Sequence, residues 1–244
     1  MEFLGPIHGV LPNGPGNPAF DTLAESPLSD VYSSAMLSYN YTLKNQGLDV
    51  MVNCTYDSQS PINIFPFPGD TTNLLIQYNG TCDGAGEVNV LPNNTQYMAL
   101  NSSNGLTFWA CKSPPSQVEP SYFIYLRGLQ DYATEIGNIT CTMSPVQPAI
   151  FHVTYQSTYD YFNTSNRITH NPTTFSGFLD QSVAAIGNLV VEGQSQRANL
   201  VAESAFTYGV EYLGLPVTGD DTLYPVIYGV MIEGIMQYLV RYSN

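Results

Sequence analysis

Two kinds of residue in this sequence are spaced for covalent chemistry. Asparagines in N-x-[Ser/Thr] sequons can carry N-linked glycans, and cysteines can pair into disulfides. All seven sequons and all four cysteines lie between residues 40 and 165. Both modifications are made in the oxidising secretory compartments, so this pattern predicts an extracellular or lumenal protein. The candidate glycosylation sites are Asn40, Asn53, Asn79, Asn93, Asn101, Asn138 and Asn163.

Three of the sequons stand an odd number of residues from a cysteine. Because side chains alternate between the two faces of a β-strand, an odd offset places them on opposite faces. Each cysteine is therefore expected to face the core while its neighbouring asparagine faces solvent. Ordinary turns rich in Asn and Thr are the alternative interpretation. The pairs are Asn53 with Cys54, Asn79 with Cys82, and Asn138 with Cys141.

The cysteines Cys54, Cys82, Cys111 and Cys141 are almost evenly spaced, and no CxxC motif occurs. Zinc-ribbon and thioredoxin-like sites are therefore disfavoured. Four cysteines allow three pairings. We expect Cys54–Cys82 and Cys111–Cys141, because each bond would join strands adjacent in the sequence. The alternative is a cytosolic protein with four buried free thiols.

The sequence contains no motif that identifies a reaction, so no catalytic residue is predicted. A pair of carboxylates could hydrolyse a glycosidic bond, and Asp131, Glu135 and Asp160 are the candidates, although each also suits a solvated turn or strand end. Ser195 lies in Gly193-Gln194-Ser195-Gln196-Arg197, which lacks the second glycine of a nucleophile elbow. We interpret that segment as a polar junction between helices.

No metal, cofactor or nucleic acid is expected to bind. The three histidines form no HxxH or HExxH pattern. The glycines of residues 80–86 have no lysine beside them and no helix after them, which favours a turn over a phosphate-binding loop. The net charge is −14, and the six Lys and Arg residues are scattered, whereas a phosphate backbone requires clustered cations.

Aromatic residues offer the one positive indication of a ligand. The chain has 18 Tyr and 11 Phe, and aromatic rings can stack on sugars. The cluster of Tyr155, Tyr159, Asp160 and Tyr161 would suit a sugar, so a glycan is one candidate partner and a protein is the other. The alternative is that these tyrosines are ordinary strand residues.

The elements predicted to position these residues are mostly strands. Residues 1–25 are rich in Pro and Gly and predict an irregular linker. Residues 26–168 predict a β domain that begins with a hairpin over 31–56, turning at Asn45-Gln46-Gly47, and contains a loop over 61–70. Further strands are expected at 73–78, 96–100, 106–112, 121–127, 135–143 and 150–156.

The apolar spacing becomes helical after about residue 172. Residues 169–244 therefore predict a segment of two or three helices that packs on the β domain. The resulting fold class is β-rich α+β, with an antiparallel β-sandwich or barrel-like sheet followed by helices. We expect this helical segment to carry no glycans because it has no sequon.

Residues 1–6 lack the cationic and apolar regions of a signal peptide, and no run of 18 apolar residues occurs. A glycosylated chain needs an entry signal, so we expect this sequence to be part of a longer parent chain. The alternatives are a gene whose start is placed too late and a compartment other than the secretory one.

Four segments resemble the extracellular part of uncharacterised membrane proteins of mushroom-forming (basidiomycete) fungi. The resemblance runs from about residue 43 to the C-terminus. It implies a membrane-anchored ectodomain with a structural or recognition role, flanked by transmembrane helices in the parent chain, and it supplies no catalytic residue. A carbohydrate-binding module and a secreted glycosidase-like enzyme are the alternatives. The resembling segments are residues 126–129, 136–142, 148–155 and 234–238.

Overall fold

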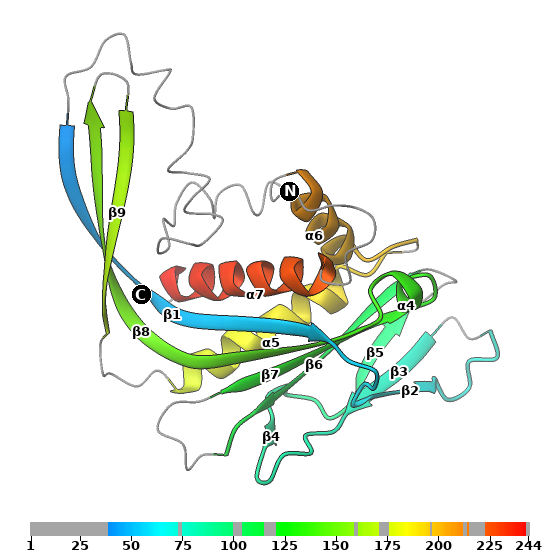
Figure 1. Ribbon diagram of the computed structural model, residues 1–244. Coiled ribbons are helices and arrows are strands. Elements are labelled where there is room, and N and C mark those ends of the chain that lie inside the picture. The colour runs from blue at the N-terminus through cyan, green and yellow to red at the C-terminus, as the bar shows by residue number, and fades with distance from the viewer. Residues whose placement is uncertain are drawn as a thin grey trace. The chain divides into compact units, whose positions relative to one another are not determined.

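The computed structural model describes residues 39–72, 75–99, 104–114, 121–158, 161–170, 176–195, 197–211, 214 and 223–242 (Figure 1). The predicted linker over residues 1–25 lies outside the described residues. The described elements are β1 (Tyr39–Tyr56), β2 (Ile62–Pro66), β3 (Leu75–Gly80), β4 (Val88–Asn89), β5 (Gln96–Ala99), β6 (Gly105–Lys112), β7 (Tyr122–Leu129), α4 (Tyr132–Glu135), β8 (Asn138–Thr158), β9 (Tyr161–His170), α5 (Ser176–Glu192), α6 (Leu200–Glu211) and α7 (Leu223–Tyr242).

The chain divides into two compact units, and the long strands β1 and β8 contribute residues to both. In the smaller unit, the last part of β8 and the whole of β9 form an antiparallel hairpin, whose register runs from Ala149 opposite His170 to Thr158 opposite Tyr161. The larger unit consists of Val50–Val146 and Phe175–Glu233. It contains both clefts described below.

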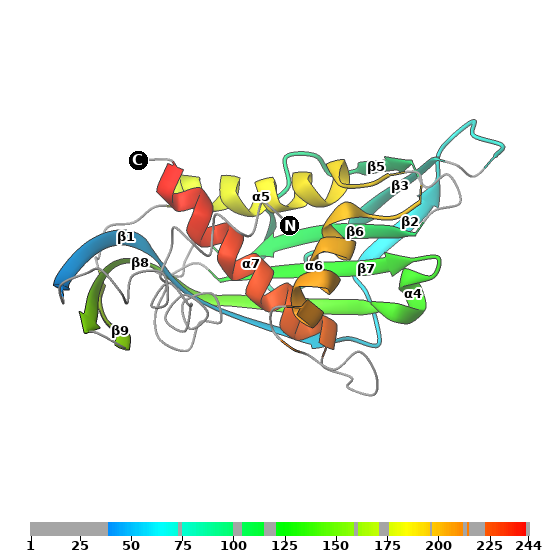
Figure 2. The same ribbon diagram turned by 90° about the horizontal axis from the view of Figure 1, so that it is seen from above.

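The strands form two antiparallel sheets, which confirms the predicted α+β class. The large sheet has the order β1-β8-β7-β6-β4, with β9 paired to β8, and the small sheet has the order β2-β3-β5. Neither sheet closes into a barrel. Within the larger unit, α5, α6 and the first part of α7 lie over one face of the large sheet (Figure 2). The helical segment predicted over residues 169–244 is therefore present, as α5, α6 and α7.

Strand β6 lies at the centre of the core because both of its faces are covered. Residues 105–111 are all buried. On one face, Phe108 packs so closely on Gly187 of α5 that a Cβ there would lie 2.8 Å from the ring. On the other face, a Cβ on Gly80 of β3 would lie 2.3 Å from the Trp109 ring. The two sheets thus pack on each other while the helices cover the opposite face.

A cluster of polar side chains holds α5 against the edge of this core. The Lys112 ammonium lies 3.0 Å from a carboxylate oxygen of Asp180 on α5, and the Tyr122 hydroxyl donates a 2.7 Å hydrogen bond to the same oxygen. Burial raises the pKa of Tyr122 well above its usual value, and the hydrogen bond to Asp180 adds to the increase. The tyrosine therefore stays protonated and keeps this contact at neutral pH.

All four cysteines form disulfides, but the predicted pairing is wrong. The bonds are Cys54–Cys141 and Cys82–Cys111, with Cα–Cα distances of 4.0 and 5.6 Å. Sheet order, rather than sequence order, decides the partners. Strand β1 lies beside β8, so Cys54 meets a cysteine 87 residues away. Cys82 follows β3, which packs against β6 and its Cys111.

The predicted hairpin over residues 31–56 is also wrong, because β1 runs without interruption from Tyr39 to Tyr56. Asn45-Gln46-Gly47 permits a turn but does not require one, and β1, whose neighbour in the large sheet is β8, continues as strand through these residues. Part of the predicted loop over 61–70 is strand β2. The rest is a turn in which Asp70 N donates to Phe67 O at 3.1 Å and Gly69 has φ +86°.

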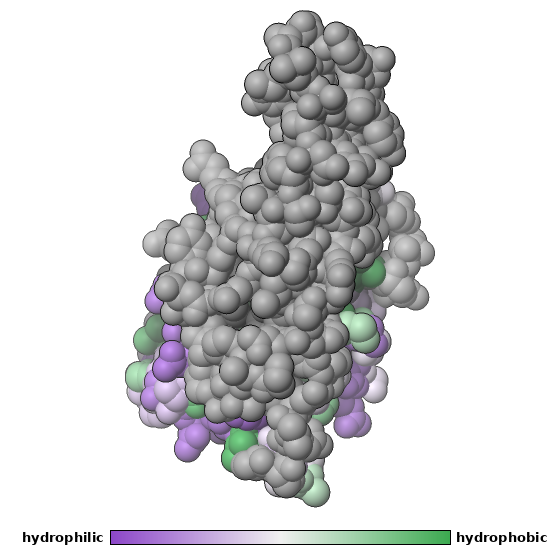
Figure 3. Space-filling model, turned by 90° about the vertical axis from the view of Figure 1, so that its left-hand side faces the viewer, coloured by the Kyte–Doolittle hydropathy of each residue, from purple (hydrophilic) through white to green (hydrophobic). Residues whose placement is uncertain are grey.

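No helix among the described residues is long and apolar enough to cross a membrane. The described surface visible in Figure 3 is mainly hydrophilic, with separate hydrophobic residues between the polar ones. Large exposed apolar side chains do occur, and some of them share one face of the small sheet.

Candidate functional site

The main candidate site begins at α4, a single helical turn that joins β7 to β8. Gln130 and Gly137 flank it with φ of +58° and +66°, and Gly128 N donates to Gly137 O at 2.8 Å to close the loop. The loop is tight, because a Cβ on Gly128 would lie 2.1 Å from Tyr132 O. This geometry buries Tyr132 and leaves Glu135 exposed.

The start of α6 provides the second wall of the site. Asn199 precedes the helix and is fully buried. Its Oδ1 accepts hydrogen bonds from Val201 N and Ala202 N at 3.0 and 3.3 Å, and its Nδ2 donates to Val190 O at 2.8 Å. Asn199 is therefore a helix N-cap that also ties α6 to the end of α5.

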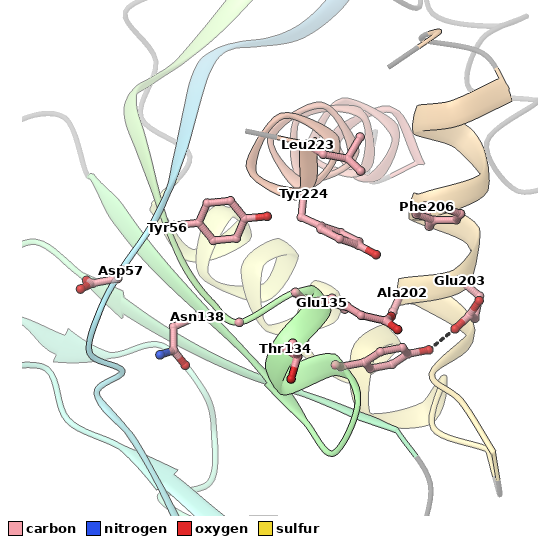
Figure 4. Close-up of a pocket in the computed structure, with 13 residues that line it drawn as sticks. Tyr56, Asp57, Thr134, Glu135, Asn138, Ala202, Glu203, Phe206, Leu223 and Tyr224 are labelled. Atoms are coloured by element: carbon pink, nitrogen blue, oxygen red, sulfur yellow. Dashed lines mark hydrogen bonds between the residues drawn. The ribbon is translucent and has the colours of Figure 1, made fainter. Parts of the chain in front are cut away.

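This cap places Glu203 on the first turn of α6, facing α4. The Tyr132 hydroxyl donates a short hydrogen bond to Glu203 Oε1 (Figure 4). The same hydroxyl accepts a hydrogen bond from Asn199 N at 3.4 Å. Tyr132 therefore fixes the position of the Glu203 carboxylate, although that glutamate is itself exposed.

Helix α7 supplies an aromatic wall. The Tyr224 ring stacks between Phe206 of α6 and Tyr228, with centroid distances of 6.1 and 6.4 Å and interplanar angles of 29° and 24°. Offset stacking of this kind holds the rings in fixed orientations. Tyr224 is half-buried and Tyr228 is fully buried, so only the outer part of the stack is open to a ligand.

These elements and the end of β1 enclose a cleft of about 930 Å³, called here the Tyr56–Tyr224 cleft. Its lining combines aromatic rings, carboxylates and small polar groups, and it contains neither lysine nor arginine. In Figure 4 the Asp57 and Asn138 side chains point away from Tyr224. The lining residues are Tyr56, Asp57, Tyr132, Thr134, Glu135, Ile136, Gly137, Asn138, Ala202, Glu203, Phe206, Leu223 and Tyr224.

The hydroxyl groups of Tyr132 and Tyr224 in the cleft stay neutral at physiological pH. Burial raises the pKa of Tyr224 to about 12, and the charges of Glu135, Tyr56 and Glu203 add to the increase. Burial also raises the pKa of Tyr132, followed by its hydrogen bond to Glu203. Glu135 and Glu203 therefore lie close enough to both tyrosines to raise their pKa values. The cleft presents negative carboxylates beside neutral hydroxyl groups.

One buried polar group behind this wall is unpaired. The Tyr228 hydroxyl has no hydrogen-bond partner among the residues that the structure describes. Burial raises its pKa well above 10, and Tyr224, Tyr132, Glu203 and Tyr56 of the cleft contribute to the increase. An unpaired buried hydroxyl costs stability.

A second, smaller hollow of about 480 Å³ lies at the other side of Asp57 and is strongly polar. Asp57, Asp83 and Glu87 line it, and burial followed by these three charges raises the pKa of Tyr125. In the described part of the chain, no group of three or more His, Cys, Asp or Glu residues is arranged to hold a metal ion.

The structure brings only one of the predicted catalytic candidates into the cleft. Glu135 lines it, whereas Asp131 precedes α4 on the exposed surface and is not among the lining residues. Tyr159 and Asp160 lie outside the described residues. Tyr155 and Tyr161 belong to the β8–β9 hairpin, but their side chains also lie outside the described part. The proposed sugar site at these four residues therefore stays a prediction.

The segments interpreted as turns or junctions are confirmed as such. Ser195 Oγ donates to Ala198 O at 2.6 Å and accepts from Ala198 N at 3.2 Å, which makes it part of the α5–α6 junction. Glu87 N donates to Gly84 O at 3.0 Å, and Gly86 has φ +82°, as expected of a glycine turn.

The predicted glycosylation sites fall into three groups. Asn53 and Asn93 are exposed, and Asn79 and Asn138 are half-buried. Asn40 and Asn163 lie on β1 and β9, where the structure does not describe their side chains, and Asn101 lies outside the described residues. The odd-offset argument applies to Asn53 with Cys54 and to Asn138 with Cys141, since each pair shares a strand. It does not apply to Asn79 with Cys82, because β3 ends at Gly80.

Several residues of the cleft carried no sequence signal. Tyr56, Glu203 and Tyr224 lie on three elements that are far apart in the chain, so no local spacing links them. Tyr132 and Glu135 do share the i, i+3 spacing of one helical turn. That spacing is too common to identify a site.

Comparisons with protein-family models, curated proteins and solved structures find no match for this chain. The site must therefore be interpreted from its own geometry.

Proposed function

We propose that this domain is the extracellular or lumenal recognition part of a glycoprotein, and that its Tyr56–Tyr224 cleft binds a saccharide without acidic groups. The two disulfides fit a secreted or extracellular protein. The resemblance to ectodomains of fungal membrane proteins supports attachment of a longer parent chain to a membrane. This location gives the cleft access to extracellular glycans.

The combination of side chains in the cleft carries this proposal. Exposed ring surface on Tyr56 and Tyr224 can pack on the C–H face of a pyranose, which buries apolar surface. The carboxylates of Glu135 and Glu203 can accept hydrogen bonds from sugar hydroxyls. The volume of about 930 Å³ is in the range of small-ligand sites.

Charge narrows the class of saccharide. No lysine or arginine is among the described residues that line the cleft, and the chain has a net charge of −14. A uronic acid, sialic acid or sulfated sugar would meet uncompensated carboxylates. Neutral sugars and amino sugars avoid this repulsion, and an ammonium group would gain from the carboxylates and the aromatic rings.

A glycosidase is the second candidate, because Glu135 and Glu203 share one cleft and paired carboxylates are the catalytic groups of most glycoside hydrolases. However, both glutamates are exposed. A catalytic acid normally needs burial to keep its proton at neutral pH. Binding without hydrolysis is therefore the function that the geometry supports better.

Binding of the purified, secreted protein to a panel of neutral, amino and acidic oligosaccharides tests the proposal. We expect selective binding of non-acidic sugars, and we expect Tyr224→Ala and Tyr56→Ala to weaken it about tenfold or more, which corresponds to about 1.4 kcal/mol. Met51→Ala is the matched control, since Met51 is an exposed side chain on β1, as Tyr56 is, and does not line the cleft.

The same panel separates binding from hydrolysis. Release of new reducing ends that stops in Glu135→Gln would establish the glycosidase and replace the proposed function. Retention of all sugars by Tyr224→Ala, or binding of acidic sugars alone, would contradict a saccharide site in this cleft.

A further inference from the structure

The small sheet presents a row of apolar and amide side chains on its outer face, away from the Trp109 side. Its inner face is buried through Ile62, Ile76, Tyr78 and Met98. Alternation along the strands places their neighbours on the outer face. Three of these are large and exposed: Phe65 at 42%, Leu75 at 41% and Tyr97 at 57%.

The strand register arranges these side chains into an aromatic platform. Phe65 on β2 and Tyr97 on β5 both lie directly opposite Gln77 on the central strand β3. Phe67, which follows β2, makes an edge contact with Tyr97 at a centroid distance of 5.8 Å. The three aromatic residues therefore form one patch, and Gln77 lies in its middle.

A sequon asparagine lies on the same face. Asn79 is two residues beyond Gln77 on β3, so it shares the outer face with the platform. Phe65 and Tyr97 are its diagonal neighbours on the two flanking strands, and such neighbours lie roughly 7–8 Å apart. Asn63, directly opposite Asn79, adds an exposed amide. A sugar linked to Asn79 would lie within reach of both rings.

We infer that the first sugars of an N-linked glycan on Asn79 pack on the Phe65–Tyr97 platform and cover it. This inference rests on the proposed extracellular location, which supplies the glycan. The C–H face of N-acetylglucosamine would bury the exposed aromatic surface, and Gln77 and Asn63 would offer hydrogen bonds to its polar groups. Exposed apolar patches favour association with other molecules, and the glycan would cover this one.

A double-mutant cycle on the protein secreted from a eukaryotic host tests the inference. Glycopeptide mass spectrometry first establishes occupancy of Asn79. Thermal unfolding is then measured for the wild type, Asn79→Gln, Phe65→Ser/Tyr97→Ser and the combined variant. We expect Asn79→Gln to lower Tm by about 2–4 °C in the wild type, because domains of this size shift by that amount per kcal/mol. We expect no further loss when the platform is already removed.

Asn53→Gln provides the matched control. Asn53 is an exposed sequon asparagine on the large sheet, and its neighbours on that face of β1 include Met51 but no aromatic residue within two positions. Its removal should cost the same Tm with and without the platform, so the coupling should be close to zero. Coupling for Asn79 but not for Asn53 would show that one glycan packs on the platform. It would exclude a general effect of glycosylation on stability.

The outcomes distinguish the inference from the proposed function. An occupied Asn79 whose removal costs the same Tm with and without Phe65 and Tyr97 would overturn the inference and leave the cleft proposal intact. Occupancy of other sequons with Asn79 empty would do the same. A chain secreted without any N-glycan would remove the basis of both. If Asn79→Gln gains binding to free oligosaccharides that Phe65→Ser abolishes, the glycan had covered a sugar-binding platform, as the inference states.

Discussion

Asn199 is the residue on which the candidate site depends most, although it does not line the cleft. Its side chain satisfies backbone groups of both α5 and α6, and its backbone N–H contacts the Tyr132 hydroxyl. Tyr132 in turn holds Glu203. A single buried amide thus connects the junction between two helices to a carboxylate of the cleft.

Replacement of Asn199 by alanine should destabilise the protein by about 2–3 kcal/mol. The variant loses the N-cap, which is worth about 1 kcal/mol, and leaves the buried Val190 carbonyl without its donor. Urea unfolding measures the change. Asn199→Ser keeps an N-cap oxygen and should recover about half of the loss. Equal stabilities for the alanine variant and the wild type would show that the buried amide is not a cap.

At the scale of elements, the disulfides decide how the strands are connected. Cys54→Ser and Cys82→Ser remove different bonds, so their effects should add. The chain-entropy model gives about 4–5 kcal/mol for the bond that spans 87 residues and about 3–4 kcal/mol for the bond that spans 29. Cys54→Ser/Cys141→Ser should cost no more than Cys54→Ser alone.

Chemical denaturation of these variants, with peptide mapping under non-reducing conditions, measures both the cost and the pairing. A Cys54→Ser/Cys82→Ser variant no less stable than either single variant would contradict the observed bonds and would favour a Cys54–Cys82 pair. The two pairings therefore predict opposite outcomes for the same double variant.

The sequence predicted most elements well where periodicity was strong. The spacing of Phe178, Val183, Ile186 and Val190 indicated α5, and the structure places that helix at Ser176–Glu192. Turns rich in Gly, Pro and Asn likewise separated the strands expected at 106–112 and 121–127, which the structure shows as β6 and β7. Both kinds of pattern are local, because each is set by residues within or beside one element.

The same local patterns could not predict which strands lie beside one another. Nothing local shows that β1 lies beside β8 or that β3 packs on β6, and both disulfides depend on those contacts. The hairpin prediction failed for a related reason, since a turn-compatible triplet continues as strand within β1, and no local pattern shows that β1 has β8 as its neighbour. The cleft was missed because it assembles Tyr56, Glu203 and Tyr224 from three distant elements.

At the scale of the whole molecule, buried tyrosines set the response to alkaline pH. Among the described residues, seven tyrosines have a raised pKa, with burial as the first cause in each case, and Tyr125 is one of them. The pKa values of Tyr208 and Tyr224 are raised to about 12, and those of four others are raised further. The folded protein therefore keeps these protons at a pH where the unfolded chain loses them. The other four are Tyr78, Tyr122, Tyr132 and Tyr228.

Stability should therefore be unaffected by these groups below pH 10 and should fall as pH rises through 10 and beyond. Above pH 10 the unfolded state binds fewer protons, so each tyrosine that stays protonated in the fold lowers the free energy of unfolding by about 1.4 kcal/mol per pH unit. Urea unfolding from pH 9 to 11.5 measures this slope. Tyrosine absorbance at high pH should rise together with the loss of structure rather than before it.

Tyr228→Phe provides the specific test of this account. Tyr228 is fully buried, and its hydroxyl has no partner among the described residues. Removal of that hydroxyl should leave stability at pH 7 equal to the wild type or slightly higher, because an unpaired buried polar group is lost. It should also reduce the slope above pH 10 by about 1.4 kcal/mol per pH unit, because one protonated tyrosine is gone. An unchanged slope would mean that Tyr228 ionises in the folded protein, which its burial in this structure opposes.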